Sequence, residues 1–180
     1  MSVNSHFGAI LNAVKEYESL LTEVTEETFT QKPADGGWSY SETFSHIFQA
    51  NLASLFAIEK CSLGTGILSD KPTHWKVRAI LFFGRFPPGK FKAPEQIVSM
   101  VKTLSKEEAA NLIIKFKSRL AELKAKVEKA DKYQKVKHPR LGLLNAKQWF
   151  RFVEIHTKHH IKQLSRIKKG LQNGKLRMES

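Results

Sequence analysis

A charge-free stretch between Glu42 and Glu59 constrains the fold more than any other feature of the chain. Ser39 and Glu42 have the spacing of a capping box, in which the two side chains satisfy free N–H groups at a helix start. The apolar residues that follow recur at helical spacing: Phe44, Ile47, Phe48, Leu52, Leu55 and Phe56. Small residues occupy roughly the opposite side, and a helix that is apolar or small nearly all round is usually buried. We therefore predict a buried helix that reaches about Lys60, in which His46 is the only titratable side chain between Glu42 and Glu59.

Three further segments show the period of a long amphipathic helix, over residues 4–24, 105–129 and 145–170. Ser105 with Glu108, and Asn145 with Gln148, repeat the spacing of a helix-start capping box. Residues 73–83 have the pattern of a short helix. No segment has convincing strand-like alternation, and no internal repeat is visible.

Proline and glycine separate these segments, at residues 32–37, 63–66, 84–90 and 138–144, where we expect turns or connecting loops. The interval between the second and third long helices is much longer than the others. The sequence therefore predicts an all-α fold, an antiparallel four-helix bundle with one long crossover between helices 2 and 3. At 180 residues the chain is expected to form one domain, residues 1–180.

Two histidines interrupt the apolar stripe of the last helix. His156 and His160 are four residues apart, so they project from one helix face and can converge on one metal ion. Imidazole suits Zn, Ni, Fe or Cu, and bundle cores are places where facing helices build metal sites. His46 is the best candidate for a third ligand. Three nitrogens with open positions are typical of a catalytic metal site.

The neighbouring polar residues have weaker assignments. Gln163, one turn beyond His160, is placed to orient a ligand or a bound water, and it is equally well explained as a surface glutamine. His159 projects about 100° away from His160, so it is a weak candidate for a general base. Glu42 lies one turn before His46 and is a candidate hydrogen-bond partner, although capping already explains it. A metal-free bundle with merely packed histidines remains an alternative.

The positive charge is concentrated in one half of the chain. Residues 1–90 carry 8 Lys and Arg against 9 Asp and Glu, whereas residues 91–180 carry 22 against 8. Such asymmetry favours anionic partners, and its ordinary explanation is a solvated lysine-rich helix face. The alternative function is therefore a non-catalytic basic bundle that binds nucleic acid or another anionic partner.

The single cysteine, Cys61, excludes an internal disulfide framework and fits a reducing compartment. It is a candidate nucleophile only if it is exposed with a lowered pKa, and a buried bystander is the simpler interpretation. No run is long enough for a membrane span, and no secretory signal is visible. We expect a cytoplasmic protein that does not insert into membranes.

Two motifs resemble those of the DinB-like superfamily of four-helix-bundle metalloenzymes. The run Trp38-Ser39-Tyr40-Ser41-Glu42-Thr43-Phe44-Ser45-His46-Ile47 is similar to the opening of that family's second helix. The second motif comprises His138-Pro139, Leu141-Gly142, Trp149, and His156 and His160 with Gln163. The His138-Pro139 loop most resembles an uncharacterised branch. Residues 61–104 carry no recognisable motif.

The resemblance implies that His46, His156 and His160 hold a divalent ion, either Zn, Ni, Fe or Mn. It also implies a small-molecule thiol or other small substrate, and a homodimer. Characterised relatives include thiol-dependent S-transferases, in which the metal is thought to activate the thiol. The leading hypothesis is therefore a metal-dependent enzyme, a thiol S-transferase or a related hydrolase-like enzyme.

Overall fold

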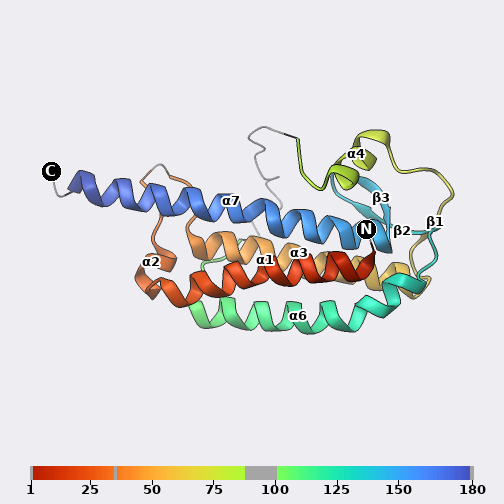
Figure 1. Ribbon diagram of the computed structural model, residues 1–180, viewed down its shortest axis with the longest axis horizontal. Coiled ribbons are helices and arrows are strands. Elements are labelled where there is room, and N and C mark those ends of the chain that lie inside the picture. The colour runs from red at the N-terminus through yellow and green to blue at the C-terminus, as the bar shows by residue number, and fades with distance from the viewer. Residues whose placement is uncertain (1, 35, 88–100, 179–180) are drawn as a thin grey trace.

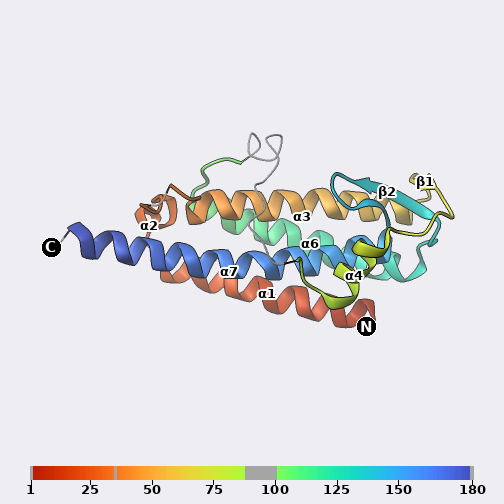
Figure 2. The same cartoon turned by 90° about the horizontal axis from the view of Figure 1, so that it is seen from above.

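Four long helices form a bundle in the computed structural model, which describes residues 2–34, 36–87 and 101–178. They are α1 (Val3–Glu23), α3 (Tyr40–Ser62), α6 (Lys106–Lys129) and α7 (Ala146–Met178). Helices α1 and α7 run in one direction, and α3 and α6 run in the opposite direction (Figures 1 and 2). Both α1 and α3 pack against α6 and α7. The predicted four-helix bundle is confirmed.

The long crossover follows from this arrangement. Because α3 and α6 are parallel neighbours, the chain must return along the whole bundle between them. The crossover contains strand β1 (Ile67–Leu68) and helix α4 (Trp75–Phe83), as the periodicity of residues 73–83 predicts for the helix. Gly84 ends α4 with a left-handed backbone at φ 68°. The predicted turn at 84–90 lies only partly within the described residues, which stop at 87 and resume at 101.

Local capping chemistry places the helix starts as predicted. Ser39 accepts a hydrogen bond from the Glu42 N–H while the Glu42 carboxylate accepts one from the Ser39 N–H. Ser105 and Glu108 form the same reciprocal pair at the start of α6. A short helix absent from the sequence prediction, α2 (Glu26–Thr30), lies in the connection between α1 and α3.

The expectation that the last helix stops near Gly170 is wrong, because α7 continues to Met178. At Gly170 a Cβ atom would lie 3.2 Å from the Cβ of Pro33, so the missing side chain allows the turn before α3 to approach the helix closely. The next residue, Leu171, is buried. Tertiary contact therefore outweighs the low helix propensity of glycine here.

The expectation of no strands, with a loop at 138–144, is also wrong. Strands β2 (Gln134–His138) and β3 (Gly142–Asn145) form an antiparallel hairpin, and β1 pairs with β2 to complete a three-stranded sheet. The turn is tight because Gly142 has φ 75° and because His138 Nδ1 accepts from the backbone N–H groups of Arg140 and Leu141. The sheet lies at the end of the bundle where α7 begins (Figure 1).

The core between the four helices is rich in aromatic side chains. Phe44 and Phe48 on α3 make edge contacts with Tyr17 of α1, and Phe48 also contacts Phe116 of α6. The Tyr17 hydroxyl donates to the backbone oxygen of Thr157 on α7 at 2.6 Å. This hydrogen bond ties α7 to α1, and the packing of Tyr17 against α3 links both to the helix that carries His46. No helix among the described residues has the length and apolar character needed to cross a membrane.

Candidate metal centre

Three histidines from two helices meet at one point between α3 and α7. Their nitrogen atoms lie within 4.8 Å of one another, one from each of His46, His156 and His160. The ring of His46 lies 5.4 Å from that of His156 and 4.9 Å from that of His160, measured between ring centroids. The structure therefore brings together the three histidines that the sequence predicts as candidate metal ligands.

A chain of hydrogen bonds sets the tautomer of His156, which is buried. The Thr157 hydroxyl donates to the backbone oxygen of Val153, so it is free to accept from the Asn51 amide NH₂ at 2.9 Å. This turns Asn51 Oδ1 toward His156 Nδ1, also at 2.9 Å. An amide oxygen only accepts, so His156 carries its proton on Nδ1 and leaves a lone pair on Nε2.

His160 is oriented in the same way by Gln163. Its Nδ1 lies 2.7 Å from Gln163 Oε1, and the Gln163 amide NH₂ is directed toward Thr43 Oγ1 at 3.5 Å. His160 Nδ1 therefore donates, and its Nε2 also keeps a lone pair. Gln163 is half-buried, and the partner of its amide oxygen is the His160 imidazole, a role that differs from both the ligand- or water-orienting residue and the surface glutamine expected from the sequence.

The resulting donor set fits a cation. The two Nε2 atoms of His156 and His160 lie 3.2 Å apart. Lone pairs at this distance repel each other unless a proton or a metal ion lies between them. A metal ion is the better match, because burial makes the protonated forms unfavourable and because neutral imidazole nitrogen is the form that ligates metals.

Burial lowers the pKa of all three histidines. The pKa of His46 falls to about 4 through loss of solvent, and that of His160 falls to about 3 through burial and proximity to His46. The pKa of His156 is well below its ordinary value, because the ring is buried and because the other histidines lie close to it. All three rings are therefore neutral near pH 7, without competition from protons.

His46 is held by packing, since no hydrogen bond to its ring occurs within the described residues. The Trp38 ring lies 5.2 Å away. Glu42 makes no hydrogen bond to His46 within the described residues: its carboxylate accepts from the Ser39 N–H and pairs with Lys32 Nζ at 3.0 Å, so the capping role that the sequence also offered explains this residue. The cluster that the described residues form consequently consists of three neutral imidazoles without a carboxylate.

Two other sequence candidates lie outside the centre. His159 is exposed and contacts the rings of Phe86 and His160, at 5.1 and 5.2 Å between centroids. Cys61 is buried, its Sγ lies 3.7 Å from the backbone oxygen of Leu144, and burial raises the pKa of its thiol to about 11. A buried protonated thiol is a poor nucleophile.

Sequence reasoning missed Asn51 and Thr157. Asn51 is completely buried within the charge-free helix, and a buried asparagine requires hydrogen-bond partners. An asparagine in a helix expected to be buried, five residues after His46, was an available signal, although Ser45, Gln49 and Ser54 are further polar residues of this helix.

Comparisons with known proteins agree with the four-helix-bundle fold. The DinB superfamily sequence profile matches residues 10–164. TT2238, described as a four-helix bundle protein, matches with a TM-score of 0.60 and 18% identity, over 92% of this chain and 99% of that chain. YfiT from Bacillus subtilis matches with a TM-score of 0.62 and 11% identity, over 94% and 87%. YfiT is described as a probable metal-dependent hydrolase with an unusual four-helix bundle topology.

At these identities the two structural matches show the fold alone. None of the curated proteins matches the sequence.

Proposed function

The chain belongs to the DinB superfamily, and we propose that it is a metal-dependent enzyme in which His46, His156 and His160 hold one divalent ion. The convergence of three neutral imidazoles, two with Nε2 lone pairs facing each other at 3.2 Å, carries this proposal. The description of YfiT as a probable metal-dependent hydrolase supports it. Zn, Ni, Fe and Mn are the candidate ions, since all accept imidazole nitrogen.

A bound ion would act as a Lewis acid that lowers the pKa of a coordinated water or thiol. The protein residues would fix the direction of the imidazoles. Asn51 and Gln163 would keep the Nδ1 protons of His156 and His160 pointing away from the ion. Three neutral ligands leave the full positive charge of the ion uncompensated, which favours an anionic further ligand such as hydroxide or thiolate.

The reaction class follows from that preference. We propose hydrolysis or thiol S-transfer on a small molecule, with S-transfer as the leading candidate. Lys162 and Arg166 are exposed on α7 close to His159 and His160, where they would attract an anionic thiol or conjugate. We further propose that residues 1–180 form one domain in a cytoplasmic homodimer.

The experiment is a paired assay on metal-loaded, tag-free protein. Thiol transfer is measured with a panel of small anionic thiols and an electrophilic acceptor, and hydrolysis with ester and amide substrates. Loss of thiol-dependent turnover in His46→Ala, with turnover retained in His159→Ala, is the expected result. Hydrolysis without thiol dependence would reject the S-transferase assignment, and no turnover of either kind would reject the enzyme.

A row of exposed cations supports a second candidate, a basic bundle that binds nucleic acid. Lys162, Arg166 and Lys169 are exposed on α7 at spacings of four and three residues, so they share one helix face. Binding of this kind would fall steeply with salt and would survive His156→Ala. Salt-insensitive binding, or none, would reject it.

A further inference from the structure

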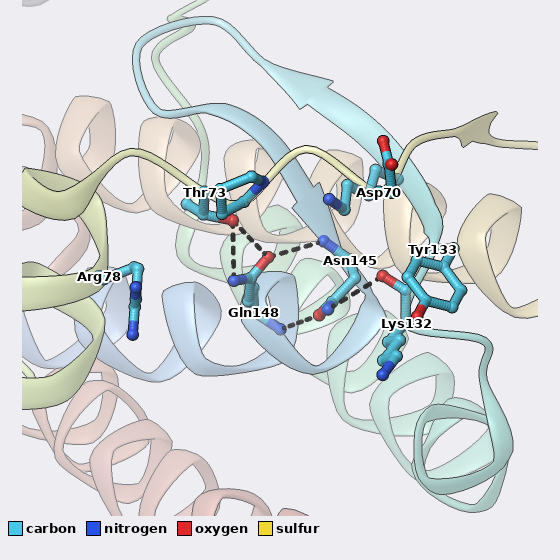
Figure 3. Close-up of a pocket in the computed structure, with 9 residues that line it drawn as sticks. Asp70, Thr73, Arg78, Lys132, Tyr133, Asn145 and Gln148 are labelled. Carbon is cyan, nitrogen blue, oxygen red and sulfur yellow. Dashed lines mark hydrogen bonds between the residues drawn. The ribbon is translucent and has the colours of Figure 1, made fainter.

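A groove separate from the three histidines runs between α4 and the first turns of α7. Two adjoining depressions form it, with volumes of about 400 and 310 Å³, and both are lined by Arg78 and Gln148. Figure 3 shows the larger one, which extends to the sheet. Gln148 precedes His156 by eight residues on α7, about 12 Å along the helix axis. None of the three histidines lines either depression.

The amide groups in this groove already satisfy one another. Gln148 Nε2 donates to Thr73 Oγ1 at 2.9 Å, and Gln148 Oε1 accepts from the Asn145 N–H at 3.0 Å. Asn145 Oδ1 in turn accepts from the Gln148 N–H, also at 3.0 Å (Figure 3). These hydrogen bonds fix the amide groups and leave them few donors or acceptors for a ligand. The charged side chains around them must therefore determine which class of ligand binds.

Those charges are predominantly positive. Arg78, Lys132 and Lys135 line the larger depression, against one acid, Asp70. The ion pairs within the described residues all involve other cations. Lys132 Nζ lies over the Tyr133 ring at 4.8 Å, an interaction that leaves its N–H groups available.

Lys135 is the most informative of the three cations, because it is only 5% exposed. It lies directly opposite Asn145 in the antiparallel ladder, so both side chains project from the same face of the sheet. Its ammonium donates to the backbone oxygen of Lys71 at 2.5 Å, and no ion pair satisfies its charge within the described residues. Lysines are almost never buried unless paired, and an ammonium has three N–H donors, so Lys135 keeps donors and a positive charge with which an anion in the groove can pair.

We propose that this groove binds a small polyanion whose phosphate or carboxylate groups pair with Arg78, Lys132 and Lys135. Lys147, which lines the second depression, extends the positive lining along α7. Arg151 is engaged elsewhere, because its Nη1 pairs with Glu154 at 2.6 Å and its Nε donates to the backbone oxygen of Leu81. The groove therefore has a buried cation at one end and exposed cations along its length.

Calorimetric titration of the full-length, tag-free protein tests the proposal, with pyrophosphate and succinate as alternative probes. Arg78→Gln and Lys132→Gln are the groove variants. Lys115→Gln, an exposed lysine on α6, is the matched control with the same charge change. Nuclear magnetic resonance of the Asn145 and Gln148 side-chain amides localises the bound probe.

We expect saturable binding, weakened about tenfold or more by each groove variant, since each removes a charge-assisted contact. Lys115→Gln should bind like the wild type, and His156→Ala should also bind, because the histidine centre is separate. Tighter binding of pyrophosphate assigns phosphate as the ligand group, and tighter binding of succinate assigns carboxylate. No binding at millimolar probe, equal weakening by Lys115→Gln, or no perturbation of the two amides would overturn the proposal.

Discussion

Replacing Asn51 with leucine should weaken metal binding although Asn51 touches no metal. Its side chain is buried and bridges His156 Nδ1 and Thr157 Oγ1, each at 2.9 Å. Leucine leaves the His156 N–H without an acceptor in a place that water does not reach. The Thr157 hydroxyl loses less, because it still donates to Val153.

Two magnitudes follow. An orphaned buried donor costs about 1–3 kcal/mol, so the free energy of unfolding of the metal-free protein should fall by that amount. Without this acceptor the His156 ring is free to rotate or to change tautomer, so its Nε2 lone pair should be directed at the metal site less often. Loss of such a ligand-orienting partner typically reduces metal affinity about 10–100-fold.

The assay is competitive titration of Zn²⁺ against a chromophoric chelator, with urea unfolding of the metal-free protein measured in parallel. Asn51→Asp is the matched control, because its carboxylate keeps the acceptor for His156 Nδ1 at nearly unchanged shape. It should retain the affinity that Asn51→Leu loses. Wild-type affinity in a folded Asn51→Leu protein would refute the orientation argument.

Three further predictions concern stability and reactivity. In the metal-free protein, the free energy of unfolding should fall as the pH drops from about 6.5 toward 4, because the unfolded chain protonates His46 at its ordinary pKa whereas burial lowers the folded pKa to about 4. Urea unfolding across this range should show that the free energy of unfolding depends less steeply on pH in His46→Phe than in the wild type. An unchanged dependence on pH would count against this reasoning. Gly84→Ala should destabilise the protein by about 1–2 kcal/mol, since Gly84 has φ 68° and a Cβ there would collide with Arg151. The control Gly8→Ala, in open space on α1, should be neutral or stabilising. Equal effects of the two substitutions in thermal unfolding would contradict the reasoning. Cys61 should resist a thiol reagent until the protein unfolds, because it is buried and its thiol pKa is raised to about 11, and rapid labelling of the native protein would show otherwise.

The parts of the fold that the sequence predicts are those set by neighbouring residues. Ser39 with Glu42, and Ser105 with Glu108, form their helix caps within four residues, so the spacing alone identifies the helix starts. The apolar periods of the long helices are equally local. The four-helix bundle with its crossover follows from them.

The parts that were missed depend on partners far along the chain. The strand Gln134–His138 exists because it pairs with Ile67–Leu68 as well as with its hairpin partner, and its own residues carry little alternation. The continuation of α7 beyond Gly170 depends on contact with Pro33. No local pattern contains either contact.

The candidate metal centre likewise contains residues that the sequence predicts and residues that it does not. The four-residue spacing of His156 and His160 is visible in sequence, and His46 stands out as the lone titratable residue of an uncharged helix. The role of Asn51 is not visible, because its direction is set by Thr157 on another helix. The spacing of one helical turn made Glu42 a candidate partner of His46. In the structure its carboxylate instead bonds the Ser39 N–H and Lys32.

Metal content measured by elemental mass spectrometry on tag-free protein tests the central claim most directly. Wild type is compared with His46→Ala and His156→Ala, and with His159→Ala as the control from the same helix. A three-histidine centre predicts about one divalent ion per chain in wild type and control, and loss of the ion from both ligand variants. If wild type and ligand variants contain equally little metal, even after reloading with Zn or Ni, the metal centre and the enzyme built on it are contradicted.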